Sequence, residues 1–145
     1  MSETEKMISL LNGLIETCKD GEKGFREAAD AVSSAFHRML LQEYSRQRGQ
    51  FASELQGVVR ALGGDPDRKG SVAGTIHRGW MNIKLAIAGK QDPAIIAECE
   101  RGEEAALKNY DHALQATFSE EIRLMLEKQN MQIRATHARV HAMAL

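Results

Sequence analysis

Apolar residues recur along most of this chain at steps of three and four, the spacing that places them on one face of an α-helix. Four long stretches keep this pattern, and they predict helices at about 4–32, 35–62, 92–117 and 119–145. The chain has only two prolines, so few positions interrupt a helix. We therefore expect an all-α fold.

Residues at the ends of these stretches agree with the predicted boundaries. Thr4, the pair Ser33 and Ser34, and Ser119 each stand at the start of a helical stretch and are candidate N-caps. Asp92 is followed by Pro93, which is typical of an N-cap and a first helical position. We place a helix start at each of these sites.

A connection of about thirty residues joins the second stretch to the third. Within it, residues 71–88 carry a narrow helical stripe formed by Val72, Ile76, Trp80 or Gly79, Ile83 and Ile87. We interpret this segment as a short helix that lies across the bundle. Trp80 is expected to be a packing residue that closes one end of the core, because large aromatic side chains dominate core burial.

The two halves of the chain share one pattern when the sequence is shifted by 85 residues. The aligned pairs are Leu11 and Ile96, Leu14 and Cys99, Cys18 and Glu103, Gly21 and Ala106, Phe25 and Tyr110, Ala28 and Ala113, Leu41 and Leu126, Gln47 and Gln132, Leu55 and Val140, and Val58 and Met143. Two helical hairpins joined by a long crossover form one of the standard four-helix-bundle topologies. The shift therefore predicts two similar hairpins.

Composition and charge narrow the functional classes. The 145 residues are 43% hydrophobic and 27% charged, which suits one domain over residues 1–145. The net charge of −1 gives no electrostatic reason to expect nucleic acid or a membrane surface as a partner. The first residues, MSETEKM, lack an apolar signal core, so we expect a cytoplasmic protein. Cys18 and Cys99 occupy core-type positions, and we expect both to be reduced and buried.

A carboxylate interrupts the core seam of the third helical stretch. Steps of three and four link Ile96, Cys99, Glu103, Ala106, Tyr110, Ala113 and Thr117. Charges are rarely buried without a partner, so Glu103 is the most informative residue of the chain. We expect it to belong to a buried polar network with Gln47, Gln50, Gln132 and Tyr110, or to pair with an arginine such as Arg48.

Four segments together resemble a known family. They read LLNGLIETCKDGEKGF at 10–25, FASELQGVVRALGGDP at 51–66, TIHRGW at 75–80 and ECERGEEAALKNYDHAL at 98–114. The chain resembles an uncharacterised bacterial family of four-helix-bundle proteins, a domain of unknown function within the ferritin-like superfamily. The resemblance implies an up-down bundle with a long helical crossover between helices two and three.

Metal-bearing ferritin-like bundles hold two metals with one Glu from each of two helices and Glu-x-x-His from the other two. The resemblance places these positions at Cys18, Glu103, residues 47–50 and residues 132–135. Only one carboxylate remains among them, and neither histidine does. Neutral amides are poor replacements for bridging carboxylates, so we expect a degenerate di-iron site that holds no metal or other cofactor.

Other candidate ligands remain in the sequence. A shift of one turn offers Glu16 and Glu98 as the single acids, and Glu43 lies one turn before Gln47. His137 and His141 stand four apart and are able to clamp a metal, but no carboxylate is spaced in sequence to join them. We interpret them as solvated histidines at a helix end, where protonation favours the helix dipole.

The sequence thus favours a non-catalytic ferritin-like bundle, a structural, interaction or stress-associated protein that forms a homodimer or other homo-oligomer. No base or cation is spaced near Cys18 to activate it, so we interpret this residue as packing. The alternative is an iron- or manganese-binding oxidoreductase with an unorthodox site, built from Glu103, Glu16, Glu98, Glu43 and His137.

Overall fold

The protein is described by a computed structural model that covers residues 1–70 and 79–144. Within these ranges the chain is all-α, as the periodicity predicts. The helices are α1 (Glu3–Ala31), α2 (Ala35–Ala61), α3 (Ile83–Ala88), α4 (Asp92–Ala113) and α5 (Glu120–Met143). The predicted boundaries of the four long helices lie within one or two residues of these, except that α4 ends at Ala113 rather than near Thr117.

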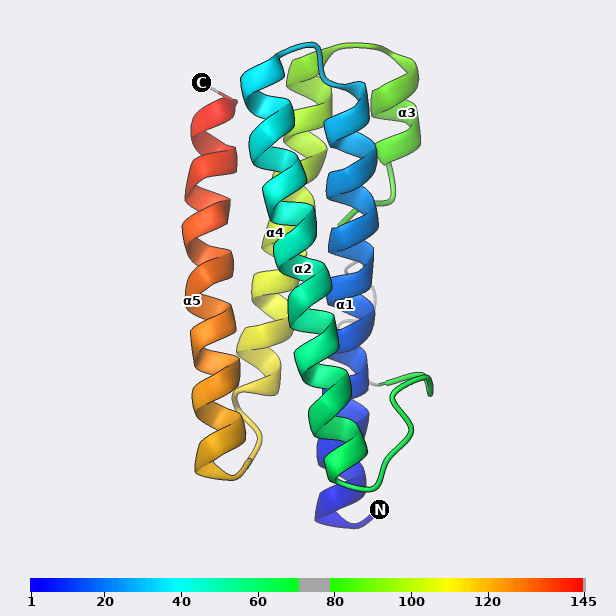
Figure 1. Ribbon diagram of the computed structural model, residues 1–145, viewed down its shortest axis with the longest axis vertical. Helices are drawn as coiled ribbons and strands as arrows, with labels where there is room; N and C mark the ends of the chain where they lie inside the picture. Colours follow the sequence, from blue (N-terminus) through cyan, green and yellow to red (C-terminus); the bar gives the residue numbers. More distant parts are fainter. Residues whose placement is uncertain (71–78, 145) are drawn as a thin grey trace.

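The four long helices lie side by side as two antiparallel hairpins, α1–α2 and α4–α5 (Figure 1). Helices α1 and α5 run in one direction along the long axis, and α2 and α4 run in the other. The first hairpin packs on the second chiefly through α1 and α4, and α2 meets α5 over a smaller area. No described helix is both long and apolar enough to cross a membrane.

Side-chain caps explain where three of the long helices begin. Ser34 accepts a hydrogen bond from the backbone N–H of His37, and Ser119 accepts one from Ile122, which confirms both as N-caps. The expectation for Thr4 is wrong. The cap of α1 is Ser2, whose hydroxyl accepts from Glu5 N–H while the Glu5 carboxylate accepts from Ser2 N–H.

Asp92 does not cap its own helix, which corrects the prediction. The N-cap position of α4 is Gln91, which makes no side-chain cap bond. The Asp92 carboxylate instead accepts hydrogen bonds of 2.8 to 3.1 Å from the hydroxyl and backbone N–H of Ser33. Ser33 lies in the turn between α1 and α2, so Asp92 ties the first residue of α4 to the first hairpin.

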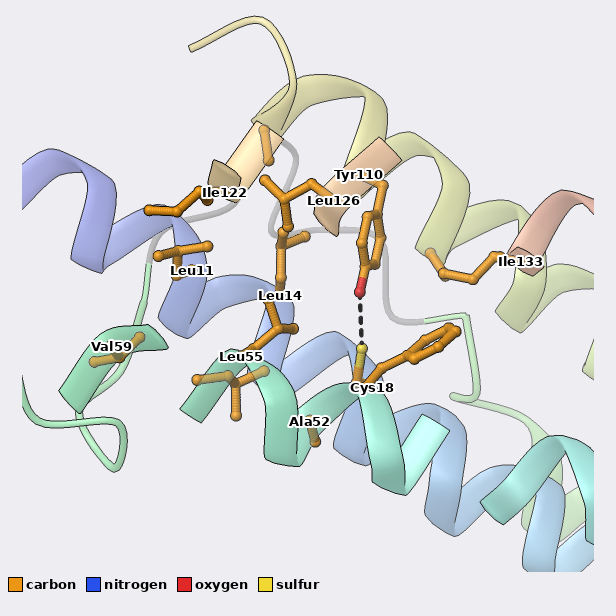
Figure 2. Close-up of a cluster of buried hydrophobic side chains, with 14 of the residues drawn as sticks. Leu11, Leu14, Cys18, Ala52, Leu55, Val59, Tyr110, Ile122, Leu126 and Ile133 are labelled. Atoms are coloured by element: carbon orange, nitrogen blue, oxygen red, sulfur yellow. Dashed lines mark hydrogen bonds between the residues drawn. The ribbon is translucent and has the colours of Figure 1, made fainter. Parts of the chain in front are cut away.

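The apolar core is divided into two clusters along the bundle. The first contains residues from α1, α2, α4 and α5, among them Leu14, Leu55 and Leu126, each fully buried (Figure 2). The second lies toward the other end and includes Phe25 and Leu41. The two cysteines are free and buried, Cys18 in the first cluster and Cys99 in the second. A polar layer lies between the two clusters.

The predicted internal repeat agrees with the burial pattern. Eight of the ten residue pairs aligned by the shift of 85 are buried at both positions, and the exceptions are Gln47 with Gln132 and Val58 with Met143. Each half of the alignment forms one of the two helical hairpins. The repeated sequence pattern therefore encodes the repeated hairpin.

The crossover differs from the predicted helix over residues 71–88. In its described part only Ile83–Ala88 is helical, and the predicted stripe residues Val72 and Ile76 lie outside the described residues. The charged end of Glu98 holds the start of α3, because its carboxylate accepts a 2.6 Å hydrogen bond from the backbone N–H of Asn82.

Trp80 packs on the side of the bundle and does not close its end. Its ring lies edge-to-face against Phe25, with centroids 4.9 Å apart, and it covers Gly24 of α1 and Gly102 of α4. A Cβ atom at either glycine would overlap the indole ring. The two glycines thus leave the space in which the Trp80 ring packs on α1 and α4. This explains why glycine stands at these positions in helices that otherwise favour larger residues.

We predict that Gly24→Ala destabilises the protein by about 1–3 kcal/mol, because the added methyl group must displace the Trp80 ring. Gly57→Ala is the matched control, since a Cβ there meets nothing within 4 Å, and it should stabilise the helix by about 0.4–1 kcal/mol. Urea unfolding measures both. Equal stability of the two variants would contradict the close packing of Trp80 on Gly24.

Candidate functional site

Glu103 lies in the centre of the bundle and is fully buried. The seam that predicts its position is confirmed over α4, where the buried members are Ile96, Cys99, Glu103, Ala106, Tyr110 and Ala113. Thr117 is exposed, because α4 has already ended at that point. A carboxylate at this depth requires a partner of opposite charge or several hydrogen-bond donors.

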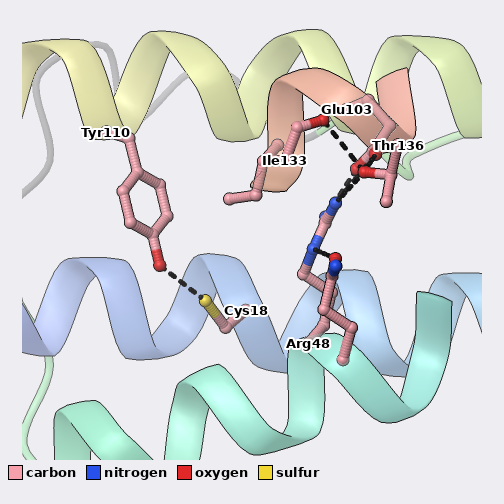
Figure 3. Close-up of polar contacts among 7 residues, drawn as sticks. Cys18, Arg48, Glu103, Tyr110, Ile133 and Thr136 are labelled. Carbon is pink, nitrogen blue, oxygen red and sulfur yellow. Dashed lines mark hydrogen bonds and ion pairs between the residues drawn. The ribbon is translucent and has the colours of Figure 1, made fainter. Parts of the chain in front are cut away.

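Arg48 of α2 supplies that partner, as the sequence allowed. Its guanidinium is buried, and Nη2 donates hydrogen bonds of 2.7 Å to Glu103 Oε2 and 2.9 Å to Thr136 Oγ1 (Figure 3). The Thr136 hydroxyl, from α5, donates to the same Glu103 oxygen at 2.6 Å. Glu103 Oε1 lies 2.5 Å from Arg48 Nη1 as an ion pair without hydrogen-bond alignment. The triad joins α2, α4 and α5.

Helix α1 makes room for the guanidinium. A Cβ at Gly21 would stand 3.3 Å from Cγ of Arg48 and 3.4 Å from Nη1, closer than most side chains tolerate. The Phe25 ring lies 5.3 Å from Arg48 Cζ, at cation–π distance. Gln47 is half-buried and accepts from Arg48 Nε at 3.3 Å. A small residue, a π face and an amide therefore surround the charge.

The electrostatics of the triad favour a permanent ion pair. Burial acts to lower the pKa of Arg48, but the charge and hydrogen bonds of Glu103 outweigh it and raise that pKa above its usual value. The guanidinium thus stays positively charged at any physiological pH. The positive charge at the centre of the bundle is therefore the guanidinium of Arg48 itself.

A second polar chain lies toward the turn between α4 and α5, separate from the triad (Figure 3). The Tyr110 hydroxyl donates to Gln129 Oε1 at 2.7 Å, and the Gln129 amide donates to the Glu54 carboxylate at 3.1 Å. Cys18 Sγ lies 3.2 Å from the Tyr110 oxygen. Since the tyrosine proton is engaged by Gln129, the thiol proton is the one that Cys18 donates to Tyr110.

Both cysteines are held as neutral thiols. Burial raises the pKa of Cys18 to about 11, despite the hydrogen bond with Tyr110 and the nearby Arg48 charge, which act to lower it. Burial also raises the pKa of Cys99, with the charge of Glu103 adding to the effect. The thiolate is the reactive form of cysteine, so this environment suits packing and not nucleophilic attack.

The structure corrects the membership of the expected amide network. Gln47 touches the triad through Arg48, and Tyr110 belongs to the second polar chain, but Gln50 and Gln132 are exposed. The inward amide of α5 is Gln129, three residues earlier. One helical position rotates a side chain by about 100°, so a repeat that is correct on average still misplaces single polar residues.

The ligand set of the alternative metal site is dispersed. Glu98 is buried, and its carboxylate already has partners. It accepts hydrogen bonds from the backbone N–H of Asn82 and, at 2.7 Å, from Nε of Arg101. Glu43 is exposed and pairs with Arg46 on the same helix. Glu16 is exposed on α1, where it lines an open cavity of about 650 Å³ beside the crossover.

The fifth member of that set, His137, stands apart from Glu103. It lies beside Glu104, with 3.8 Å between His137 Nε2 and Glu104 Oε1, and His141 Nδ1 lies 2.9 Å from Glu100 Oε2. The interpretation that no carboxylate joins the two histidines is therefore wrong. The missed signal is that Glu100 and Glu104 are also four apart, as the histidines are, on the facing antiparallel helix.

The residues at the bundle centre do not fit a pair of bridged metal ions. Such a site needs several carboxylates and two imidazoles that converge. Here the centre provides one carboxylate, already bound by a guanidinium and a hydroxyl, and a thiol with a raised pKa. A divalent cation would have to compete with Arg48 for Glu103, the one acid that the described residues place at this centre.

Comparison with known sequences gives one family. A family described as a domain of unknown function (DUF2383) matches residues 6–116, which span α1 to α4. No curated protein matches the chain. The match confirms the expected resemblance to an uncharacterised domain family.

We predict that removing either member of the buried ion pair costs about 3–5 kcal/mol, because the remaining charge is left without a partner. Arg48→Met and Glu103→Leu test this singly. The double variant should recover most of the loss, since apolar residues of similar size often replace a buried pair without cost. Urea unfolding of the four proteins forms a double-mutant cycle. Additive losses would show that the two charges do not depend on each other.

We predict that stability falls as pH rises from about 9 to 11. The thiol of Cys18 ionises near the ordinary cysteine pKa of 9.0 when the chain is unfolded, but only near 11 when it is folded. The folded state therefore holds its proton longer, and its stability is complete below pH 9 and declines above it. Cys18→Ala should remove about 2–3 kcal/mol of this decline. Urea unfolding at several pH values measures the free energy of unfolding of both proteins. If this free energy falls equally with pH in the original protein and in Cys18→Ala, the prediction is wrong.

Proposed function

This chain belongs to the DUF2383 family of unknown function, and we propose that it is a ferritin-like four-helix bundle with a non-catalytic, structural or interaction role. In this proposal an internal ion pair replaces the metal centre of the superfamily. The arrangement of the helices supports the ferritin-like part: α1 and α2 form one hairpin, α4 begins at the end of the bundle that holds the α1–α2 turn, and α4 and α5 form the other hairpin (Figure 1).

The observation that carries the proposal is the guanidinium of Arg48 at the centre of the bundle. It is buried, it binds the carboxylate of Glu103, and Gly21 on the neighbouring helix leaves space for it. A cation of the chain thus holds the acid that a metal would use. Chemistry at this centre would require the pair to separate inside a low-dielectric core, which is costly.

The neighbouring polar groups also favour a structural role. Catalytic acids, bases and nucleophiles need pKa values near the working pH. Burial raises the pKa values of both Cys18 and Tyr110, so each keeps its proton at neutral pH. Their hydrogen bonds are made with each other and with Gln129, within the core.

We predict that the purified protein does not accelerate the oxidation of Fe²⁺ by oxygen, and that it holds no metal that depends on Glu103. Cells supplemented with iron and manganese supply the protein for elemental analysis, and oxygen uptake after Fe²⁺ addition measures the activity. Glu103→Gln should leave both readouts unchanged, as should the exposed control Glu43→Gln.

Two metals per chain in the original protein, lost in Glu103→Gln and kept in Glu43→Gln, would overturn the proposal. So would Fe²⁺ oxidation above the buffer rate that the Glu103 variant abolishes. Circular dichroism of each variant confirms that the helices are intact before either result is interpreted.

A further inference from the structure

Two pairs of side chains face each other along the rim between α4 and α5. Glu100 and Glu104 stand one turn apart on α4, and His137 and His141 stand one turn apart on α5. The helices are antiparallel, so a step of four toward their connecting turn on α4 matches a step of four toward it on α5. Glu100 therefore meets His141, and Glu104 meets His137.

The ligand atoms of three of these residues converge. One carboxylate oxygen each from Glu100 and Glu104 and a ring nitrogen of His137 all lie within 4.8 Å of one another. His137 Nε2 is buried and makes no hydrogen bond with any described residue. The His137 side chain is 28% exposed as a whole, and its Nε2 stands 3.8 Å from Glu104 Oε1, beyond hydrogen-bond distance. Atoms this close are within reach of one shared cation.

We propose that Glu100, Glu104 and His137 bind one divalent transition-metal ion of the zinc type at this rim. Three protein ligands leave a fourth, tetrahedral position for water. The imidazole favours a transition metal over Ca²⁺ or Mg²⁺, which prefer oxygen ligands alone. Ligand atoms around a tetrahedral zinc lie about 3.4 Å apart, so small side-chain shifts complete the site.

His141 has a different role, as a positioning residue. Its Nδ1 lies 2.9 and 3.0 Å from the two Glu100 oxygens, which suits a donor that orients a ligating carboxylate. Nδ1 carries a single proton, so His141 would keep one Glu100 oxygen when the other turns to the metal. Loss of such an outer hydrogen bond typically costs about 10-fold or more in metal affinity, less than loss of a ligand.

This site is independent of the buried ion pair. Glu104 follows Glu103 in sequence, but it is exposed and faces His137, whereas Glu103 is fully buried against Arg48. The ion would join two helices whose contacting residues lie 33 and 41 positions apart in the chain. Because only the folded hairpin brings these groups together, metal binding must stabilise the folded state.

Zinc titration of the metal-free protein by calorimetry tests the proposal, and Co²⁺ absorbance reports the ligand geometry. We expect one Zn²⁺ per chain and a melting temperature that rises with zinc concentration. His137→Gln and Glu104→Gln should each weaken binding more than 10-fold and abolish that rise, and His141→Gln should have the smaller effect. His112→Gln, at the last turn of α4, is the control and should bind as the original protein does.

Three results would overturn the proposal: no saturable binding at one equivalent, unchanged affinity in His137→Gln, or an equal loss in His112→Gln. A stoichiometry of one zinc per two chains, with a dimer that appears only with zinc in sedimentation, would also count against a site within one hairpin. Zinc that depends on His137 and not on Glu103 separates this result from the test of the bundle centre.

Discussion

The buried contact between Arg48 and Glu103 is the constraint on which the arrangement of this bundle depends. A charged pair in the core gains stability only when its geometry is good and its remaining donors and acceptors are satisfied. Here Thr136 from α5 and Gln47 from α2 add hydrogen bonds to the pair, Glu103 Oε1 faces the guanidinium as an ion pair, and Gly21 of α1 leaves the space. All four long helices must therefore keep one relative height and rotation. A slip of one turn would separate Arg48 from Glu103 and leave both buried charges without a partner.

The polar layer also explains why the core has two apolar clusters. On each long helix the layer residue, Gly21, Arg48, Glu103 or Thr136, falls between members of the first cluster and members of the second. Apolar packing alone tolerates sliding of helices, because many positions along a seam are equivalent. A charged layer at one height removes that equivalence. In this bundle the polar residues select the register, and the apolar clusters provide most of the stabilisation.

Much of this arrangement could be predicted because it depends on periodicity. Steps of three and four located the long helices, placed Glu103 in the core and related the two hairpins through one shift. The errors lie where a single rotation or a contact between distant segments decides the outcome. Gln132, which the shift of 85 places inward, is exposed, whereas Gln129, which the steps of three and four on α5 place inward, is buried. Trp80 is held on the side of the bundle by Gly24 and Gly102, whose spacing in sequence carries no periodic signal.

Adjacent carboxylates on α4 show how one helix supports two unrelated environments. Successive residues point about 100° apart, so Glu103 enters the core while Glu104 reaches the rim beside α5. In the core, the cost of desolvation demands a partner fixed by the fold, and a guanidinium meets that demand permanently. At the rim, solvent reduces the cost, and the facing histidines present ring nitrogens at matching heights. The ion pair at the centre and the group of Glu and His side chains at the rim share a helix but no side chain, so either can change without the other.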